Sequence, residues 1–197
     1  MTMNGPRIIL ASQSPRRKQL LEWAEIPFEI MVQPTDESFP PDMPVPDVPV
    51  HIAREKALAV RKKYTSLHDD DNIIIAADTV VVLGNTIIGK PKDREDALSI
   101  LARLAGNKHQ VITGVVLLKG EREIAFADTT DVWFHPLTAE QIAFYVDKYQ
   151  PYDKAGAYAI QEWIGVIGIR SIQGDFYNVM GLPVSRVVAE LANLLMG

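Results

Sequence analysis

Hydrophobic and polar positions along this 197-residue chain follow the two periods that distinguish helices from strands. Helical spacing separates Ala53, Ala57 and Val60, whereas the run Ile73 to Ala77 is apolar throughout, as in a buried strand. Helices are expected at residues 15–25, 50–64, 94–105 and 139–149 and from Pro183 onward. Strands are expected at residues 7–11, 28–32, 110–118, 124–134, 157–161 and 166–172, and two more inside 73–88 are joined by a tight turn at Gly84-Asn85.

The ends of the predicted helices carry residue types that terminate helices. Ser14, Asp93 and Thr138 each stand where an N-cap is needed, and Gln141 completes a capping box with Thr138. Gly106 follows the end of the third helix, in the position that favours glycine. The alternation of helices with strands, some joined by hairpins, predicts an α/β fold around a mixed sheet.

One segment is expected to be irregular. Residues 34–49 hold six of the chain's 13 prolines, which exclude regular structure and make this stretch the best candidate for a mobile loop. No internal repeat interrupts the remainder of the chain. The length suits one domain covering residues 1–197, in one or two lobes.

Composition and charge narrow the function classes. The formal net charge of −5 argues against a general nucleic-acid binder, because such proteins usually carry a basic field, so any phosphate site must be local. The absence of cysteine excludes disulfides, thiolate metal sites and a thiol nucleophile. No apolar run is long enough to cross a bilayer or to form a signal-peptide core, so we expect a cytoplasmic protein without a membrane partner.

The segment from Ser12 to Arg17 is a candidate oxyanion site. It lies where a strand leads into a helix, and a helix N-terminus offers free N–H groups and partial positive charge. Ser12 and Ser14 add hydroxyls, and Arg16 and Arg17 add guanidinium groups. An alternative is that Ser14 only caps the helix while both arginines form a solvated face.

Three acidic residues are candidates for catalysis or metal binding. Asp78 follows the apolar run 73–77 and is therefore expected at the end of a buried strand, where α/β enzymes place catalytic groups. It could equally be structural, because a buried carboxylate needs hydrogen bonds or a metal. Asp36 and Glu37, at the edge of the proline-rich segment, could complete a Mg²⁺ site or remain solvated on the surface.

Two further patterns are weaker. Residues 84–90 match most of a P-loop, but Pro91 stands where the Mg²⁺-binding hydroxyl belongs, so we reject that match while keeping Lys90 as a candidate phosphate ligand. The four histidines show no metal-ligand spacing, and each is expected at the surface or in a loop; they are His51, His68, His109 and His135.

Taken in order, the motifs resemble those of the Maf family over the whole chain from about Ile8 to the last helix. The matching segments are Ser12-Gln13-Ser14-Pro15-Arg16-Arg17, Asp36-Glu37, Ala53-Arg54-Glu55-Lys56-Ala57, Ala77-Asp78-Thr79-Val80, Gly89-Lys90-Pro91, Asp153-Lys154-Ala155-Gly156-Ala157-Tyr158 and Gly181-Leu182-Pro183. The resemblance implies an elongated mixed sheet flanked by helices, related to the inosine triphosphate pyrophosphatases, with a central cleft between two lobes. It also implies a divalent-metal-dependent hydrolase, with Mg²⁺ or Mn²⁺ as cofactor, and a homodimer.

The resemblance assigns roles to individual residues. Asp78 would be the catalytic carboxylate, and Glu37 would help to hold the metal. A carboxylate among cations is a weak base, so we favour Asp78 as a metal ligand that orients water. The side chains that would embrace the triphosphate are those of Arg16, Arg17, Lys56, Lys90 and Lys154.

Three positions distinguish branches of the family that differ in the base they bind. Arg16, Thr79 and Gln161 resemble the branch that cuts dTTP and UTP to the nucleoside monophosphate and pyrophosphate. A glutamine amide supplies both an acceptor and donors for the edge of a pyrimidine. The alternatives are a Maf enzyme acting on N7-methyl-GTP and a non-catalytic, nucleotide-binding regulator of septum formation.

Overall fold

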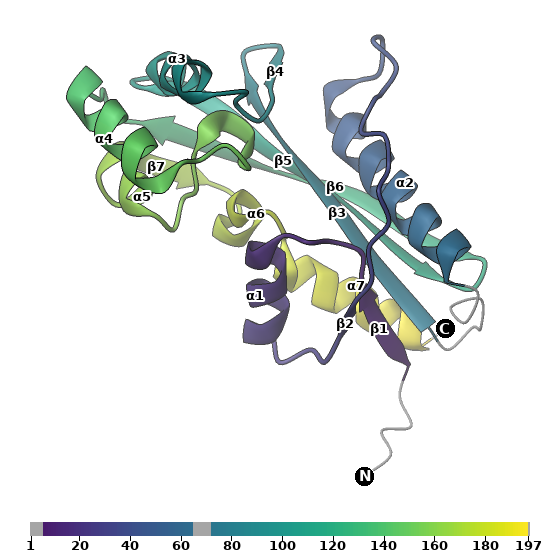
Figure 1. Ribbon diagram of the computed structural model, residues 1–197. Helices are drawn as coiled ribbons and strands as arrows, with labels where there is room; N and C mark the ends of the chain where they lie inside the picture. The colour runs from purple at the N-terminus through teal and green to yellow at the C-terminus, as the bar shows by residue number, and fades with distance from the viewer. Residues whose placement is uncertain (1–5, 65–71, 197) are drawn as a thin grey trace. The chain divides into compact units, whose positions relative to one another are not determined.

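A computed structural model describes residues 6–64 and 72–196, which form a mixed seven-stranded sheet with helices packed against it (Figure 1). The strands are β1 (Arg7–Leu10), β2 (Glu29–Ile30), β3 (Asn72–Leu83), β4 (Thr86–Ile88), β5 (Lys108–Lys119), β6 (Arg122–Phe134) and β7 (Ile169–Gln173). The α-helices are α1 (Pro15–Trp23), α2 (Val48–Lys63), α3 (Arg94–Leu104), α4 (Ala139–Tyr149), α5 (Trp163–Gly168), α6 (Phe176–Met180) and α7 (Val184–Met196). Two short 3₁₀ helices are η1 (Val45–Asp47) and η3 (Ala155–Ala157).

The chain divides into two compact units. The first unit comprises residues 1–78, 113–128 and 181–197, and the second comprises residues 79–112 and 129–180. Strands β3, β5 and β6 each contribute residues to both units, so the division does not follow chain order. The predicted single domain 1–197 and the predicted cleft between lobes stay predictions.

In the first unit, β1 pairs in parallel with β2 on one side and with β3 on the other. Helix α2 covers one face of this sheet, where Ala53 and Ala57 pack with Ile74 and Ala76 of β3. The close approach requires Gly114 on β5, because a Cβ there would lie 2.2 Å from the backbone nitrogen of Val50. The sheet therefore fixes the position of the first turn of α2.

In the second unit, β3 turns back into β4 as an antiparallel hairpin, and β7 pairs antiparallel with β6. Helices α3 and α4 pack against each other. Their N-caps are the predicted ones, since Asp93 accepts a hydrogen bond from the backbone N–H of Asp96, and Thr138 forms the full capping box with Gln141. The predicted tight turn at Gly84-Asn85 is also confirmed.

The α/β class, the mixed sheet and the five long helices agree with the sequence prediction, but several local expectations are wrong. Strand β3 continues through Asp78, and α5 includes the first residues of the strand expected at 166–172. Residues 157–161 hold the end of η3, an irregular stretch and a turn in place of a strand. Helix α6 was not predicted. Helix α2 begins at Val48, because Pro49 is tolerated in a first turn. The polar run 65–71 lies outside the described residues.

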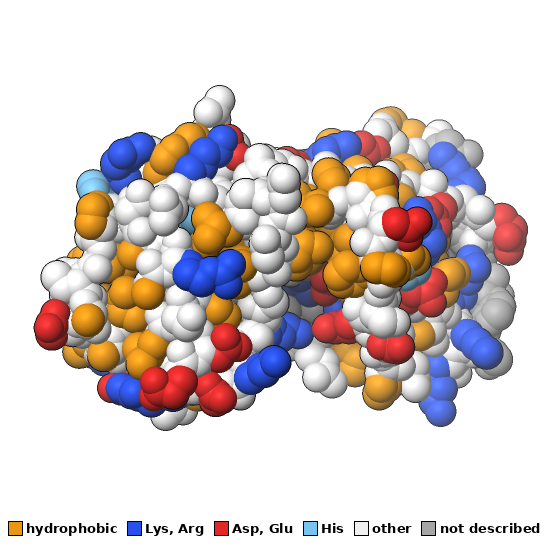
Figure 2. All heavy atoms as spheres, turned by 90° about the horizontal axis from the view of Figure 1, so that it is seen from above, with side chains coloured by type: hydrophobic (Ala, Val, Ile, Leu, Met, Phe, Trp, Pro, Cys, Tyr) orange, Lys and Arg blue, Asp and Glu red, His pale blue; other side chains and the backbone are white. Residues whose placement is uncertain are grey.

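The charge on the surface and the composition of the helices are relevant to two possible partners, nucleic acid and membrane. Figure 2 shows Lys and Arg side chains interspersed with Asp and Glu on the face that it draws, without a continuous basic field there. Among residues 6–64 and 72–196, no helix combines the length and the apolar composition that crossing a membrane requires.

Candidate active site

Asp78 lies beyond the end of a parallel strand pair, although not at the end of its own strand. The pairing of β1 with β3 ends at Leu10 opposite Ile75, and β3 then continues past it. Asp78 is thus the first polar side chain of β3 beyond this pairing, close to where β1 leads into α1. The prediction that Asp78 ends its own strand was wrong. Asp78 nevertheless lies beyond the carboxyl end of β1, and α/β enzymes commonly place catalytic groups at the carboxyl ends of parallel strands.

A lysine joins the two predicted acidic ligands. Side chains alternate along a strand, so Asp78 lies on the same face as Ala76, which is the face that α2 covers. From α2, the Nζ of Lys56 lies 2.7 Å from Glu37 Oε1 and 2.7 Å from Asp78 Oδ1. The two carboxylates therefore carry oxygens no farther apart than twice that distance.

The burial of this cluster is uneven. The side chains of Lys56 and Asp78 are 18% and 15% exposed, whereas Glu37 is 47% exposed. Next to Glu37, the carboxylate of Asp36 accepts hydrogen bonds from the backbone N–H and the hydroxyl of Ser38. Asp36 therefore orders the backbone around Glu37 through Ser38, and its part in a metal site stays a prediction.

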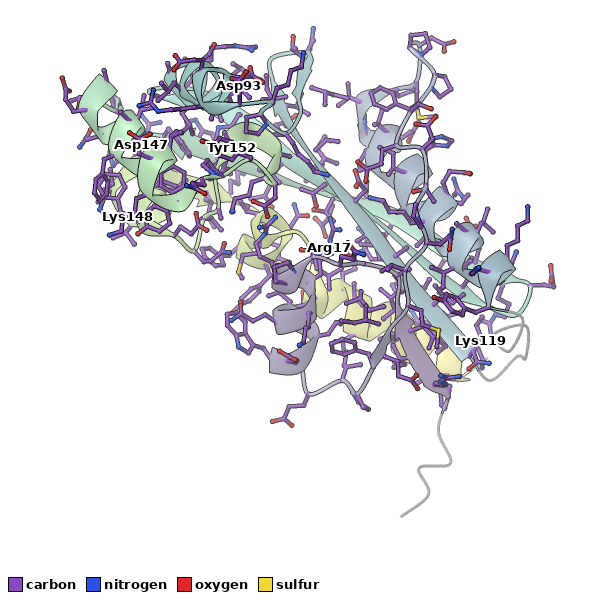
Figure 3. All side chains as sticks on the ribbon, in the orientation of Figure 1. Arg17, Asp93, Lys119, Asp147, Lys148 and Tyr152 are labelled. Carbon is purple, nitrogen blue, oxygen red and sulfur yellow. The ribbon has the colours of Figure 1, made fainter. Side chains whose placement is uncertain are left out.

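Residues 12–14 lead into the first turn of α1, which carries Arg17 (Figure 3). The guanidinium of Arg17 donates from Nε to the carbonyl of Gly181 at 2.8 Å and from Nη1 to Ser12 Oγ at 3.2 Å. Ser12 Oγ also accepts from the backbone N–H of Ser14. These bonds hold the turn against the segment that precedes α7.

Arg17 is not part of a solvated face, because it is only 9% exposed. Burial lowers the pKa of Arg17, and the negative charge of Asp78 acts in the opposite direction. A guanidinium stays charged under either influence. Ser14 does cap α1, through a long 3.5 Å bond from the backbone N–H of Arg17, so that half of the alternative interpretation is confirmed. Arg16 is half-buried.

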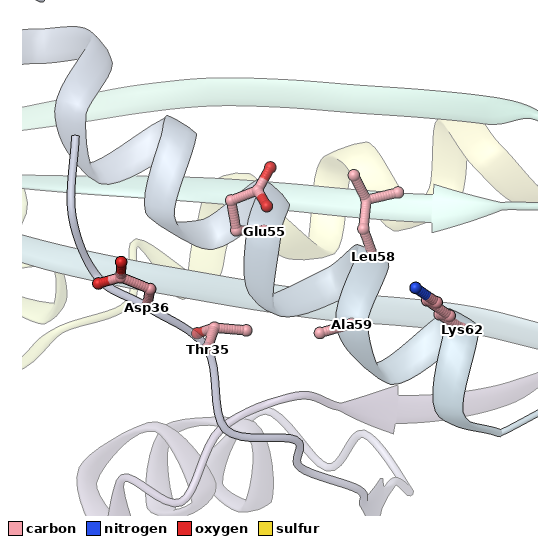
Figure 4. A pocket seen from close by; sticks show the side chains of 6 residues that line it. All are labelled: Thr35, Asp36, Glu55, Leu58, Ala59 and Lys62. Carbon is pink, nitrogen blue, oxygen red and sulfur yellow. The ribbon is translucent and has the colours of Figure 1, made fainter. Parts of the chain in front are cut away.

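A shallow hollow of about 350 Å³ lies between the proline-rich segment and α2. It is lined by neighbours in sequence of the cluster formed by Glu37, Lys56 and Asp78. Figure 4 shows Thr35 and Asp36 on one side of it, facing Glu55, Leu58, Ala59 and Lys62 of α2. Of the residues in the acidic motif, only Asp36 lines it. The hollow is therefore separate from the Glu37, Lys56 and Asp78 cluster.

In the second unit, a backbone hydrogen bond joins the segments that carry the two remaining lysines. The N–H of Gly156 donates to the carbonyl of Gly89 at 3.1 Å, so the residue before Lys90 lies against the loop after Lys154. This contact needs glycine at 156, where φ is +71° and a Cβ would lie 2.9 Å from Val81. Lys90 is exposed, whereas Lys154 is 9% exposed.

Lys154 lies beside two carboxylates to which the sequence prediction assigned no role. Its Nζ lies 2.7 Å from Asp153 Oδ1 and 3.7 Å from Glu162 Oε1. The hydroxyl of the buried Tyr145 donates to Glu162 Oε2. Tyr145 follows the helical hydrophobic period, and nothing in that pattern distinguishes it from an ordinary core residue.

His109 was expected at the surface, and this expectation is wrong. It is 1% exposed on β5, and its Nε2 lies 2.8 Å from the hydroxyl of Tyr158, the last residue of the Asp153 to Tyr158 motif. Burial lowers the pKa of His109 to about 4 and raises that of Tyr158. Both rings pack edge to face with Phe134, so the pair is a neutral hydrogen bond inside an aromatic cluster.

The three positions expected to read the base are distributed over the two units. Arg16 belongs to the first unit, and Thr79 and Gln161 belong to the second. Thr79 is half-buried and projects to the face of β3 opposite Asp78. Gln161 lies exposed in the turn before α5. Their convergence on one base stays a prediction.

The chain matches known proteins over nearly its whole length. The sequence model of the family described as "Maf-like protein" matches residues 7–194. A dTTP/UTP pyrophosphatase of Cytophaga hutchinsonii is 48% identical over 98% of this chain and 86% of its own length. One of Bacteroides thetaiotaomicron is 47% identical over 95% of this chain and 96% of its own.

A solved structure resembles the fold. The Staphylococcus aureus Ham1 protein aligns with a TM-score of 0.50 at 16% identity, covering 95% of this chain and 98% of that protein. At this identity the likeness concerns the fold alone. It agrees with the α/β class and the mixed sheet that the sequence predicted.

Proposed function

The chain belongs to the Maf-like protein family, and on that basis we propose that it hydrolyses dTTP and UTP to the nucleoside monophosphate and pyrophosphate. The observation that carries the proposal is the contact of Lys56 with both Glu37 and Asp78 beyond the end of the β1 and β3 pairing. Relatives with this activity are 46% to 48% identical over nearly the full chain.

The reaction requires charge neutralisation and an oriented water. Water attacks the α phosphorus and a new P–O bond forms, while the bond to the bridging oxygen breaks as pyrophosphate leaves with that electron pair. The proton that the attacking water loses passes to solvent. We assign Asp78 to orient the water, because its 2.7 Å contact with the Nζ of Lys56 holds the carboxylate in place. The cations that would neutralise the phosphates are Arg16, Arg17, Lys56, Lys90 and Lys154, with Ser12 and Ser14 as hydroxyl donors.

The residues fit a divalent metal such as Mg²⁺ or Mn²⁺. Glu37 and Asp78 both lie within reach of one small cation, since each approaches the same ammonium nitrogen at 2.7 Å. Within residues 6–64 and 72–196 no cluster of three His, Asp or Glu side chains could hold a metal by itself. This suits Mg²⁺, which typically binds through one or two carboxylates together with substrate phosphates and water. When bound, the metal would neutralise the triphosphate and make water more acidic.

The products of the reaction test the proposal. Purified protein with Mg²⁺ or Mn²⁺ should release pyrophosphate and the nucleoside monophosphate from dTTP and UTP. Chromatography identifies both products. Orthophosphate with the nucleoside diphosphate as first products would contradict cleavage between the α and β phosphates. Faster turnover of N7-methyl-GTP would instead assign the chain to the other branch of the family, and no turnover with any nucleotide would favour a regulator.

Two further expectations concern the location of the protein in the cell and its oligomeric state. We place the protein in the cytoplasm because its proposed substrates belong to the intracellular nucleotide pool. The homodimer that the family resemblance implies is testable by light scattering on the purified chain.

A further inference from the structure

We propose that Tyr145 and Glu162 form a brace that positions Lys154 for the substrate's phosphates. This inference rests on the function proposed above, because it assumes that Lys154 binds the triphosphate. All residues of the brace lie in the second unit. Neither Tyr145 nor Glu162 belongs to the motifs that carried the family resemblance.

Lys154 has an inner and an outer carboxylate partner. The outer one, Asp153, is 62% exposed, and an ion pair in that setting contributes little because water competes for both groups. The inner one, Glu162, is only 22% exposed and approaches a lysine that is itself 11% exposed. Asp153 is the nearer partner, at 2.7 Å against 3.7 Å, but Glu162 is the one whose charge is less screened by water.

Glu162 is fixed in turn by Tyr145. The Tyr145 hydroxyl donates to Glu162 Oε2, which leaves Oε1 toward Lys154. The same hydroxyl accepts the backbone N–H of Ala159 at 3.2 Å. Tyr145 is fully buried on α4, and its ring stacks on Tyr149 with centroids 5.0 Å apart. One hydroxyl thus connects α4 both to the carboxylate and to the backbone of the segment between Lys154 and Glu162.

The position of Glu162 supports a role beyond helix capping. Glu162 occupies the N-cap of α5, where a side chain ordinarily accepts a backbone N–H, yet it makes no capping hydrogen bond. Its carboxylate turns instead toward Tyr145 and Lys154. A simple helix start would not need this arrangement.

The backbone after Lys154 needs such support. Gly156 and Ala157 both have left-handed φ values, of +71° and +58°. At Ala157 this conformation is strained because the residue has a Cβ, so neighbouring contacts must hold it. The bonds from Gly156 to Gly89 and from Ala159 to Tyr145 supply these contacts on either side.

The brace has a consequence for binding. A flexible lysine side chain loses rotamer entropy when its ammonium is fixed on a ligand. A lysine that the protein already holds in place loses less, so the substrate binds more tightly. Removing the brace should therefore raise KM and leave kcat nearly unchanged, because the same contact is weakened in ground state and transition state.

The experiment compares Tyr145→Phe and Glu162→Gln with Tyr149→Phe, which removes a hydroxyl one helical turn away. Both brace variants should raise KM for dTTP by about 3- to 10-fold with kcat within about twofold, while Tyr149→Phe behaves as wild type. In a Lys154→Met background, Tyr145→Phe should have no further effect, because the brace acts through the lysine. An equal rise in KM in that background would overturn the proposal.

A second readout does not depend on turnover. The rate at which an acetylating reagent modifies Lys154, followed by mass spectrometry, should rise several-fold in Tyr145→Phe and in Glu162→Gln. If wild type shows no turnover but the labelling rates rise, the proposed function fails and the brace stands. Unchanged labelling of Lys154 in two folded brace variants would overturn the brace itself.

Discussion

The two units hold their candidate site residues by different means. In the first unit, Lys56 of α2 contacts Asp78 of β3 and Glu37 of the irregular segment between β2 and η1 directly. In the second unit, Lys154 sits in an irregular segment, and buried neutral hydroxyls support its surroundings. The first arrangement consists of ion pairs, whereas in the second the ion pairs of Lys154 are accompanied by hydrogen bonds from buried tyrosine hydroxyls.

The difference follows from what each local structure can fix. Helix α2 and strand β3 have backbones fixed by their own hydrogen bonds. The backbone at Lys56 and at Asp78 is therefore held in place without help from side chains. The turns from 154 to 162 have no such ladder, and they obtain rigidity from Tyr145 and from the pair of His109 with Tyr158. Substitutions can break each half of this comparison separately.

The largest effect is expected at Asp78. Asp78→Asn removes charge with little change of size, and kcat/KM for dTTP should fall by about 10³-fold or more, because the water loses its orientation and the metal loses a ligand. The thermal midpoint should change little, since an amide oxygen can still accept from Lys56. Steady-state kinetics and calorimetry measure both quantities.

The matched control is Glu123→Gln, which removes a carboxylate that pairs with Arg54 in the same unit. It should keep full activity. If Asp78→Asn kept an activity within a few-fold of wild type, Asp78 would have no part in the mechanism and its charge would be dispensable.

A smaller effect, on stability, is expected at His109. Burial lowers its pKa to about 4 from an ordinary value of 6.5, so between these pH values only the unfolded chain binds the proton. The free energy of unfolding therefore falls as the pH drops through that window, by on the order of 2–3 kcal/mol, and levels off below it.

Urea unfolding from pH 7 to pH 4 measures this loss. His109→Gln keeps a hydrogen-bond partner for Tyr158 without a titrating ring, so it should lose less stability than wild type over the same window. The exposed His135→Gln should follow the wild-type curve. If the free energy of unfolding fell equally with pH in wild type and in His109→Gln, titration of His109 would not be the cause of the loss.

The smallest effect concerns the base. Gln161→Glu replaces a donor and an acceptor by acceptors alone, and an unpaired acceptor against the pyrimidine carbonyls costs about 1–3 kcal/mol, so kcat/KM for dTTP and UTP should fall by about tenfold. Gln150→Glu adds the same charge at an exposed site of the second unit and serves as control. Unchanged ratios among dTTP, UTP and N7-methyl-GTP would show that position 161 does not read the base.

The sequence by itself determined much of this protein. Periodicity and capping residues located the five long helices and the strands β1, β3, β5 and β6, because these signals act over a few residues. The order of short motifs identified the family. The motifs also singled out Glu37, Lys56 and Asp78, which the structure brings into contact.

Tertiary structure decided what local patterns could not express. Asp78 looked like the end of a strand, but β3, which also neighbours β5, continues beyond the region paired with β1 and pairs with β4 from Val81 onward. His109 and Tyr145 became buried hydrogen-bonding groups because distant segments, carrying Tyr158 and Glu162, fold against them. Burial and the pairing of polar groups depend on contacts between residues far apart in the chain, and a local pattern of residue types does not contain those contacts.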